Sequence, residues 1–339
     1  MTDAHTASPR AVDHHRSQRL RQSLNRALVY GVLFGGTLFM ALPFYWMVTS
    51  SLKTAREAQR FPPTWIPAIE RTEDWQSKGK IEQLTISLGQ VVTPHYWTDQ
   101  LRWSNYPRAW FLQTSEGTPP AEDNFTQYFF NSTLVAVIAT VGALLTSVLA
   151  AYALATMSFF GAGLFFFLII GTLYIPGQIL LIPNYLFFDT LGREVHPALG
   201  RNTYFVLFIP WIANVASIFL LRQSFMTLPR DLFDAARIDG AGRLRHLFVI
   251  VLPLSKPTLI TVCILNFLGT WNSLLWPLIM APEPRYRTIM VGLGHFRTEA
   301  GDSYDLLMAA STFSVLPIVI LFFILQRYFI AGIARSGLK

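Results

Sequence analysis

The chain has 339 residues, a formal net charge of +7 and 52% apolar residues, but only 14% of its residues are charged. Soluble globular domains carry about 25% charged residues. So few charges cannot cover a water-exposed surface of this size, which excludes an ordinary soluble enzyme. The single cysteine, Cys263, also excludes an intrachain disulfide and a thiolate metal cluster.

Residues 1–26 form a basic arm that contains five arginines and precedes a long apolar run, 27–52. This run is too long for the apolar core of a signal peptide, and no small-residue cleavage pattern follows it. We therefore predict an uncleaved first membrane span over 27–52. The arginines of the arm are expected to set the topology and to lie near anionic lipid.

The next segment, 53–123, is a long loop that carries five of the nine tryptophans of the chain. Its residues Leu84–Leu88 alternate in polarity, which predicts a short strand. A loop of this length has structure or a function of its own. Two interpretations stay open: a small cap on the outer helix ends, or a docking surface for an extracytoplasmic partner.

Apolar blocks without Asp, Glu, Lys or Arg define the rest of the fold. A helix needs about 20 apolar residues to cross a bilayer, and runs this continuous predict helices rather than the alternating strands of a barrel. The longest block fits two crossings with a break near Ser158–Gly163. The sequence thus predicts an all-α integral membrane protein with six transmembrane helices. The five blocks are 27–52, 124–188, 202–221, 257–282 and 306–326.

Pro176 and Pro183 interrupt the third predicted span. Proline inside a membrane helix frees carbonyl groups and marks a kink. Two interpretations stay open here as well: a kink that serves helix packing, or one that opens beside a transport path.

The distribution of charge predicts the orientation. With both termini inside, the inner segments carry 14 Lys and Arg against 5 acidic residues, and the outer segments carry 13 against 15. Lys and Arg concentrate on the cytoplasmic side of membrane proteins. We therefore predict that both termini are cytoplasmic and that the loop 53–123 is extracytoplasmic.

The inner segment 227–257 has the local signals of a short helix. Pro229 suits a first helical position, Asp231 and Asp234 follow where the helix dipole favours anions, and Gly240 is a natural helix stop. Such a helix suits insertion into a groove of another protein, although an amphipathic helix on the membrane surface has the same pattern. The apolar contact face of the helix would consist of Leu232, Phe233, Ala236 and Ile238.

A second short helix is predicted over 243–251. Pro253 is expected to end it. Ser255 is expected to cap the fifth membrane helix, just ahead of Pro257.

The spacing around Gly240 resembles the cytoplasmic EAA loop in permeases of binding-protein-dependent ABC importers. That loop reads Glu-Ala-Ala, three residues, Gly, nine residues and Ile-x-Leu-Pro. This chain has Asp234-Ala-Ala, three residues, Gly240, nine residues and Ile250-Val-Leu-Pro253. Asp234 keeps the charge of the family's Glu with a shorter reach. Further segments look like the carbohydrate-uptake branch, above all the smaller permease of maltose-type transporters: Asp239-Gly-Ala, Leu252-Pro-Leu-Ser-Lys-Pro257, Trp271-Asn272, Trp276-Pro277 and Gln326-Arg-Tyr-Phe-Ile-Ala-Gly332.

The resemblance implies a multi-pass subunit in the plasma or inner membrane of a prokaryote, with a five-helix core over 124–330 and a cytoplasmic tail over 331–339. It implies as partners two ATP-binding cassette subunits, which bind ATP and Mg, a second permease and an extracytoplasmic solute-binding protein. No cofactor, metal site, catalytic residue or nucleic-acid contact is expected in this chain. The residues that the resemblance assigns to ATPase coupling are Asp234, Ala235, Ala236, Arg237, Asp239, Gly240, Ile250, Leu252 and Pro253.

Two further sites are expected. The resemblance implies that the loop between the last two spans contacts the binding protein through Gly292, Leu293, Gly294, His295, Phe296 and Arg297. A sugar path needs amides for hydroxyl groups and flat aromatic faces, although helix packing uses the same residues. The candidates at membrane depth are Tyr174, Gln178, Asn214, Asn266, Trp271 and Asn272.

The source of energy is expected to lie outside the chain. The sequence has no Gly-x-x-x-x-Gly-Lys-[Ser/Thr] phosphate loop, and its apolar blocks hold no Asp, Glu, Lys or Arg of the kind that ion-coupled carriers use. Two alternatives remain. One is a membrane-embedded glycosyl- or lipid-group transferase, for which Asp302 and Asp305 near His295 form the outer acidic cluster. The other is a self-sufficient secondary carrier.

Overall fold

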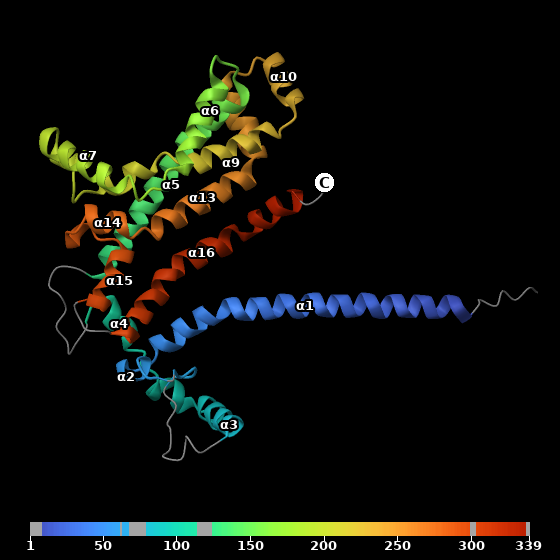
Figure 1. Cartoon of the computed structure of the whole chain (residues 1–339), viewed down its shortest axis with the longest axis vertical. Coiled ribbons are helices and arrows are strands. Elements are labelled where there is room, and N and C mark those ends of the chain that lie inside the picture. The colour runs from blue at the N-terminus through green and yellow to red at the C-terminus, as the bar shows by residue number, and fades with distance from the viewer. Residues whose placement is uncertain (1–8, 62, 68–78, 114–123, 299–302, 337–339) are drawn as a thin grey trace, which may run out of the picture. The chain divides into compact units, whose positions relative to one another are not determined.

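The structure is a computed structural model that describes residues 9–61, 63–67, 79–113, 124–298 and 303–336; the side chains of 9–24, 297–298 and 327–336 are not described. The chain divides into two compact units, Met1–Leu101 and Arg102–Lys339. Every regular element in the described residues is helical (Figure 1). The predicted all-α class is therefore confirmed.

One long helix begins the first unit. α1 spans Pro9–Ser51, and its stretch Asn25–Ser51 has the length and apolar character of a membrane span. Directly after it, the buried Lys53 ammonium donates a 2.6 Å hydrogen bond to the Thr64 carbonyl and lies 4.1 Å from the centre of the Trp46 ring. Burial lowers the pKa of Lys53. The chain after the span is thus folded back onto the end of α1.

The loop after the first span is helical rather than extended. The short helix α2 (Ala55–Ala58) comes first, and α3 (Lys80–Val91) follows the undescribed residues 68–78. The predicted strand over Leu84–Leu88 is wrong, because these residues lie inside α3. Apolar side chains at positions 81, 84 and 88 recur at helical spacing, and this longer period outweighs the five-residue alternation.

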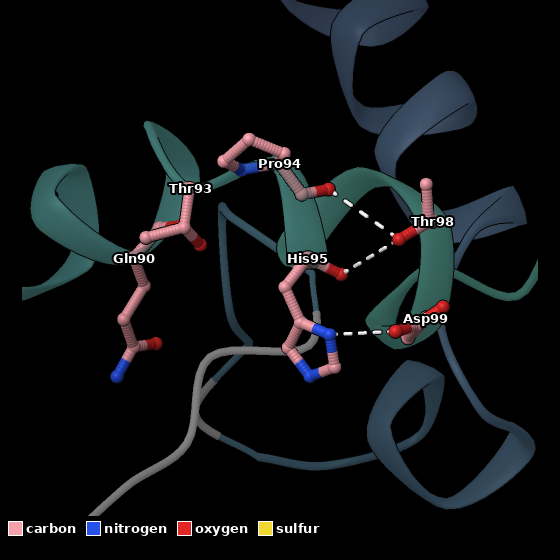
Figure 2. Close-up of polar contacts among 6 residues, drawn as sticks. All are labelled: Gln90, Thr93, Pro94, His95, Thr98 and Asp99. Atoms are coloured by element: carbon pink, nitrogen blue, oxygen red, sulfur yellow. Dashed lines mark hydrogen bonds and ion pairs between the residues drawn. The ribbon is translucent and has the colours of Figure 1, made fainter.

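A tight turn follows α3 and leads into one turn of π-helix, η2 (Tyr96–Gln100) (Figure 2). On the exposed side of this turn, His95 Nδ1 lies 2.6 Å from a carboxylate oxygen of Asp99. On its inner side, the buried Tyr96 hydroxyl donates a 2.7 Å hydrogen bond to the Pro67 carbonyl. The loop therefore has packing of its own. This packing fits the cap interpretation and leaves the docking interpretation open.

The second unit begins within the predicted outer loop, because its first helix packs against α5 and α16. Its helices in chain order are α4 (Asn105–Trp110), α5 (Phe125–Thr156), α6 (Ala162–Gly171), η3 (Thr172–Tyr174), α7 (Leu181–Glu194), η4 (Pro197–Leu199), α8 (Tyr204–Phe208), η5 (Ile209–Trp211), α9 (Val215–Met226), α10 (Arg230–Ile238), α11 (Arg243–His246), η6 (Leu247–Val251), α12 (Leu252–Leu254), α13 (Lys256–Trp271), α14 (Leu275–Met280), η7 (Pro284–Tyr286), α15 (Ile289–Thr298) and α16 (Tyr304–Ser336).

The centre of this unit is α5. It packs along α9 and α13 and runs from the end of the unit that carries α4 and α15 to the end that carries α10 (Figure 1). Three clusters of buried side chains lie along it: one around Phe125 and Trp271, one around Val135 and Trp276, and one around Tyr152. α5 is thus one continuous helix that connects the two ends of the unit.

Four helical stretches of the described residues are long and apolar enough to span a membrane: Asn25–Ser51, Phe125–Thr156, Pro197–Met226 and Tyr304–Gln326. A fifth is present if Arg243–Leu254 and Lys256–Trp271, which meet at 83°, form one bent span.

The remaining predicted span, which is the third in chain order, is not a continuous helix. The break expected near Ser158–Gly163 is confirmed, since α5 ends at Thr156 and α6 begins at Ala162. A second break follows η3, and α7 begins only at Leu181. Pro176 lies in that break and Pro183 in the first turn of α7. The count of six spans therefore stays a prediction.

Candidate functional site

The predicted helix before Gly240 is α10. It begins at Arg230, one residue after the predicted Pro229, and carries Asp231 in its first turn. Gly240 adopts a left-handed conformation with φ of 70°. The Ala241 N–H donates to the Ala236 carbonyl at 2.9 Å, and the Gly240 N–H donates to the Arg237 carbonyl at 3.1 Å. These two bonds form a Schellman motif, which ends the helix and turns the chain where a residue with a Cβ would be strained. The predicted helix stop is confirmed.

One face of α10 packs against the rest of the chain, and the opposite face points away from it. Phe233 and Ala236 pack inward, and Ala236 is buried. Asp234 and Ile238, one helical turn apart, lie on the opposite side, where Ile238 is 86% exposed. Ala235, Arg237, Asp239 and Gly240 are exposed as well. Most of the residues predicted for coupling are therefore available to another molecule.

The segment after Gly240 differs in part from the prediction. α11 passes into a π-helical turn, η6, which holds the half-buried Ile250, and α12 continues through Leu252 and Pro253 to Leu254. The helix Arg243–Leu254 runs one residue past Pro253 and ends there, where it meets α13 at 83°, so the predicted end at Pro253 is correct to within one residue.

Ser255 precedes α13 but does not cap it through its side chain. Its φ of −99° and ψ of 13° differ from the extended conformation that an N-cap needs. Its buried hydroxyl has no hydrogen-bond partner among the described residues. The predicted cap is therefore wrong, and the chain bends sharply at this serine instead.

Three side chains fasten α10 to the end of α5, and we call Tyr152, Phe233 and His246 the clasp. The His246 ring is 5% exposed, and its Nδ1 shares a 2.9 Å hydrogen bond with the Tyr152 hydroxyl. The Phe233 ring lies 4.4 Å from the His246 ring, centre to centre. A cavity of about 160 Å³ lies beside the clasp and is also lined by Arg237 and Arg243. The clasp makes α10 part of a packed body with α5.

The residues predicted to contact a binding protein lie at the other end of α5. Gly292, Leu293, Gly294, His295 and Phe296 belong to the helix α15 rather than to a loop tip, and the side chain of Arg297 is outside the described residues. The buried Phe296 ring stacks on Phe125 at 6.0 Å. A Cβ at Gly292 would overlap the ring of Tyr128.

Hydrogen bonds also fix the start of α15 to α5. Asn131 donates to the carbonyls of Arg285 and Arg287 at 2.9 and 2.8 Å, and the Ser132 hydroxyl accepts the Ile289 N–H at 2.7 Å. Contacts of α5 therefore hold α15 at its start and α10 at its end. The contact with a binding protein itself stays a prediction.

Three of the predicted substrate-path residues have structural partners. Asn214 caps α9 by accepting the Ser217 N–H, and Asn266 donates to the Ser217 hydroxyl at 2.8 Å. The buried Trp271 indole donates to the Ser314 carbonyl at 3.2 Å. These contacts correspond to the helix-packing alternative, and a role in the path stays untested.

The other three candidates are exposed, although Asn272 also donates a hydrogen bond to the Leu268 carbonyl at 2.9 Å. Tyr174 is 85% exposed. Gln178 and Asn272 line a common pocket of about 600 Å³. Two further residues of this pocket, Asn184 and Trp211, were missed by the sequence analysis, although the neighbouring Pro210 signals a helix break.

Comparison with known proteins finds relatives over most of the chain. A family model described as "Binding-protein-dependent transport system inner membrane component" matches residues 143–335. The arabinooligosaccharides transport system permease protein AraQ of Halalkalibacterium halodurans is 39% identical over 212 residues, which are 62% of this chain and 74% of that protein. The sn-glycerol-3-phosphate transport system permease protein UgpE of Yersinia enterocolitica is 33% identical over 236 residues, 69% of this chain and 80% of that one.

Solved structures with a similar fold include one of a known importer. It is a bacterial ABC transporter involved in the import of the acidic polysaccharide alginate, and the likeness covers 93% of this chain and 98% of that one. The TM-score is 0.65 at 21% sequence identity, a level at which the likeness supports the fold alone.

Proposed function

Since the chain belongs to the family of binding-protein-dependent transport system inner membrane components, we propose that it is the permease subunit of an ATP-driven importer of sugars or related solutes. The resemblance to this family is confirmed by the family match. The relatives are transport permeases, so the predicted non-catalytic role is confirmed too. The family and the apolar helices make the chain a multi-pass protein of the bacterial inner membrane.

The observation that carries the coupling role is the geometry of α10. This surface helix exposes Asp234, Arg237 and Asp239 and ends in a left-handed glycine turn. The clasp fastens it to α5, the longest helix of the second unit without a charged residue. A partner that pulls on α10 therefore moves α5, because the buried His246 transmits the displacement. In this proposal two ATP-binding subunits, which hold ATP and Mg, each receive one such helix in a surface groove.

The length of α5 supports placing two partners on opposite sides of the membrane. Tyr128, which packs on α15, and Tyr152, which belongs to the clasp, are separated along α5 by about 36 Å at 1.5 Å per residue. The hydrocarbon core of a bilayer is about 30 Å thick. The ATP-binding subunits then lie on the cytoplasmic side with both chain termini. The solute-binding protein contacts the outer end near α15, and a second permease completes the path.

The names of the relatives support sugars or their derivatives as the solute class. AraQ is named for arabinooligosaccharides and UgpE for sn-glycerol 3-phosphate. The two solutes differ in charge, since one is a neutral saccharide and the other a phosphate ester. The family therefore leaves the charge of this chain's solute undecided.

The alternative of a membrane-embedded transferase has less support. Among the described residues, no group of three or more His, Cys, Asp and Glu could hold a metal ion. Of the outer acidic cluster, Asp302 is outside the described residues and Asp305 is buried at the start of α16. The transport proposal needs no such cluster.

Cross-linking tests the proposal. In a Cys263→Ser background, Ile238→Cys places a thiol on the outward side of α10, and Val195→Cys places one on the exposed segment after α7. We expect Ile238→Cys to cross-link to a co-purifying ATP-hydrolysing subunit, and Val195→Cys to react only with reagent added outside the cell. Purification without any ATPase, or cross-linking of that ATPase to position 195 instead of 238, would refute the proposal.

A further inference from the structure

Three interrupted helices of the second unit meet at the pocket that holds Gln178 and Asn272. One break lies between η3 and α7, one between η5 and α9, and one between α13 and α14. The pocket, of about 600 Å³, is lined by residues from each of these places. α14 also packs against α7 and α8, so the breaks are neighbours in space (Figure 1). Interrupted membrane helices that converge in this way form solute sites in transport proteins.

Two tryptophans give the pocket its aromatic character. Trp276 is buried, and its indole N–H donates a 2.8 Å hydrogen bond to the Val206 carbonyl. Its ring also packs edge-on against Phe188 at 5.9 Å, so its position is fixed. Trp211 lines the same pocket and is 40% exposed, so part of its indole is open to a ligand. A flat aromatic surface of this kind suits the C–H face of a sugar ring.

Amide side chains supply the polar part of the pocket. Gln178 and Asn184 form no side-chain hydrogen bond with any other residue in the described part of the chain. Asn272 donates through Nδ2 to the Leu268 carbonyl at 2.9 Å, which orients its amide. An amide both donates and accepts, as a sugar hydroxyl does, so these side chains match hydroxyl groups in either direction.

Charge is missing from the pocket. None of the twelve described residues that line it is Asp, Glu, Lys, Arg or His. A phosphate or carboxylate placed there would lose its hydration without the Arg or Lys partners that such anions use. A neutral hydroxylated ring carries no such penalty.

We propose that this pocket binds one ring of a neutral oligosaccharide, with the ring on Trp211 and its hydroxyl groups on the amides of Gln178, Asn184 and Asn272. The proposal rests on the transport function proposed above and selects the neutral solute class within it. It also gives the proline-marked break in the third predicted span a place beside the solute path.

Ligand-observed NMR on the assembly that co-purifies with the tagged full-length chain, in lipid nanodiscs and without the solute-binding protein, tests this pocket. The probes are the neutral trisaccharides arabinotriose and maltotriose, an anionic uronate trisaccharide, and glycerol 3-phosphate. We expect saturation transfer to a neutral trisaccharide and binding about tenfold weaker in Trp211→Ala. Trp97, a half-exposed residue of η2 that does not line the pocket, gives the matched control, and Trp97→Ala should bind like the wild type. Asn272→Ala is expected to weaken the same neutral probe.

Three results would overturn the proposal: no binding of either neutral trisaccharide, stronger binding of an anionic probe, or neutral binding that is equal in Trp211→Ala and Trp97→Ala. Co-purification of the ATP-hydrolysing subunit is recorded for every variant. Its loss from the wild-type assembly would refute the transport function, whereas its retention without neutral-sugar binding refutes the pocket alone.

Discussion

The glycine turn after α10 is the feature that a single substitution perturbs most cleanly. A Cβ at Gly240 would meet no atom within 4 Å, so a substitution there adds backbone strain and no steric clash. With φ of 70°, a residue with a Cβ pays about 1 to 2 kcal/mol to keep this conformation. That strain lowers the population of the turn by about 5- to 30-fold. Asn tolerates the left-handed region, so Gly240→Asn is the matched control for Gly240→Val.

The assay is ATP hydrolysis by the reconstituted importer, measured with and without the loaded solute-binding protein. We expect Gly240→Val to assemble and to insert normally but to lose about tenfold of the solute-stimulated rate, because the turn that presents α10 is rarely formed. Gly240→Asn should retain most of it. Equal stimulation in the two variants would show that the left-handed turn does not matter for coupling, and would refute the proposed role of α10.

Three further predictions follow from individual contacts. Tyr152→Phe leaves the buried His246 Nδ1 without its hydrogen-bond partner, which costs about 1 to 3 kcal/mol of folding stability, so the melting temperature and the coupled ATPase rate should both fall. The control is Tyr185→Phe, which should change neither, because the Tyr185 hydroxyl has no hydrogen-bond partner in the described residues. Gly292→Ala should destabilise the protein by about 1 to 3 kcal/mol in thermal unfolding, because the added Cβ would overlap the Tyr128 ring. Gly294→Ala on the same helix has open space around the added Cβ and should be neutral or stabilising, so equal effects of the two substitutions would contradict the packing of α15. Burial, with smaller contributions from Glu57 and Tyr45, raises the pKa of Tyr96 from 10.0 to about 12. The stability that its neutral hydroxyl provides is therefore complete below pH 10 and is lost as the pH rises to about 12. Hydrogen exchange of residues 96–100 should show this loss, which should be absent in Tyr96→Phe.

Local signals predicted α10 well because each of its features depends on near neighbours. Asp231 interacts with the helix dipole in the first turn, and Gly240 ends the helix within its last turn. Both features are present in the structure. The clasp was not predictable in this way. Tyr152 and His246 are 94 residues apart, and neither lies in a pattern that indicates its partner. Only the packing of α11 on α5 brings them together.

The errors have physical causes as well. A charge-free block measures how much apolar sequence is present, but it does not report where a helix breaks, so 164–188 was counted as one span. The break around Pro176 is the position where this counting fails. Trp211 was missed for the same reason, because a tryptophan in an unbroken apolar helix would be indistinguishable from a lipid-facing one.

The contrast between α5 and its neighbours suggests how a coupling helix can change a solute path. α5 is continuous over 32 residues and is fixed at one end by the clasp and at the other by Asn131 and Ser132. Under the proposed coupling, we expect a displacement of α10 to be carried along α5 as a rigid-body movement. The helices around the pocket are each interrupted, and chain breaks absorb changes in backbone angle that a continuous helix resists. Movement of α5 should thus alter the angles at those breaks first, which are the places where Gln178, Trp211 and Asn272 line the pocket.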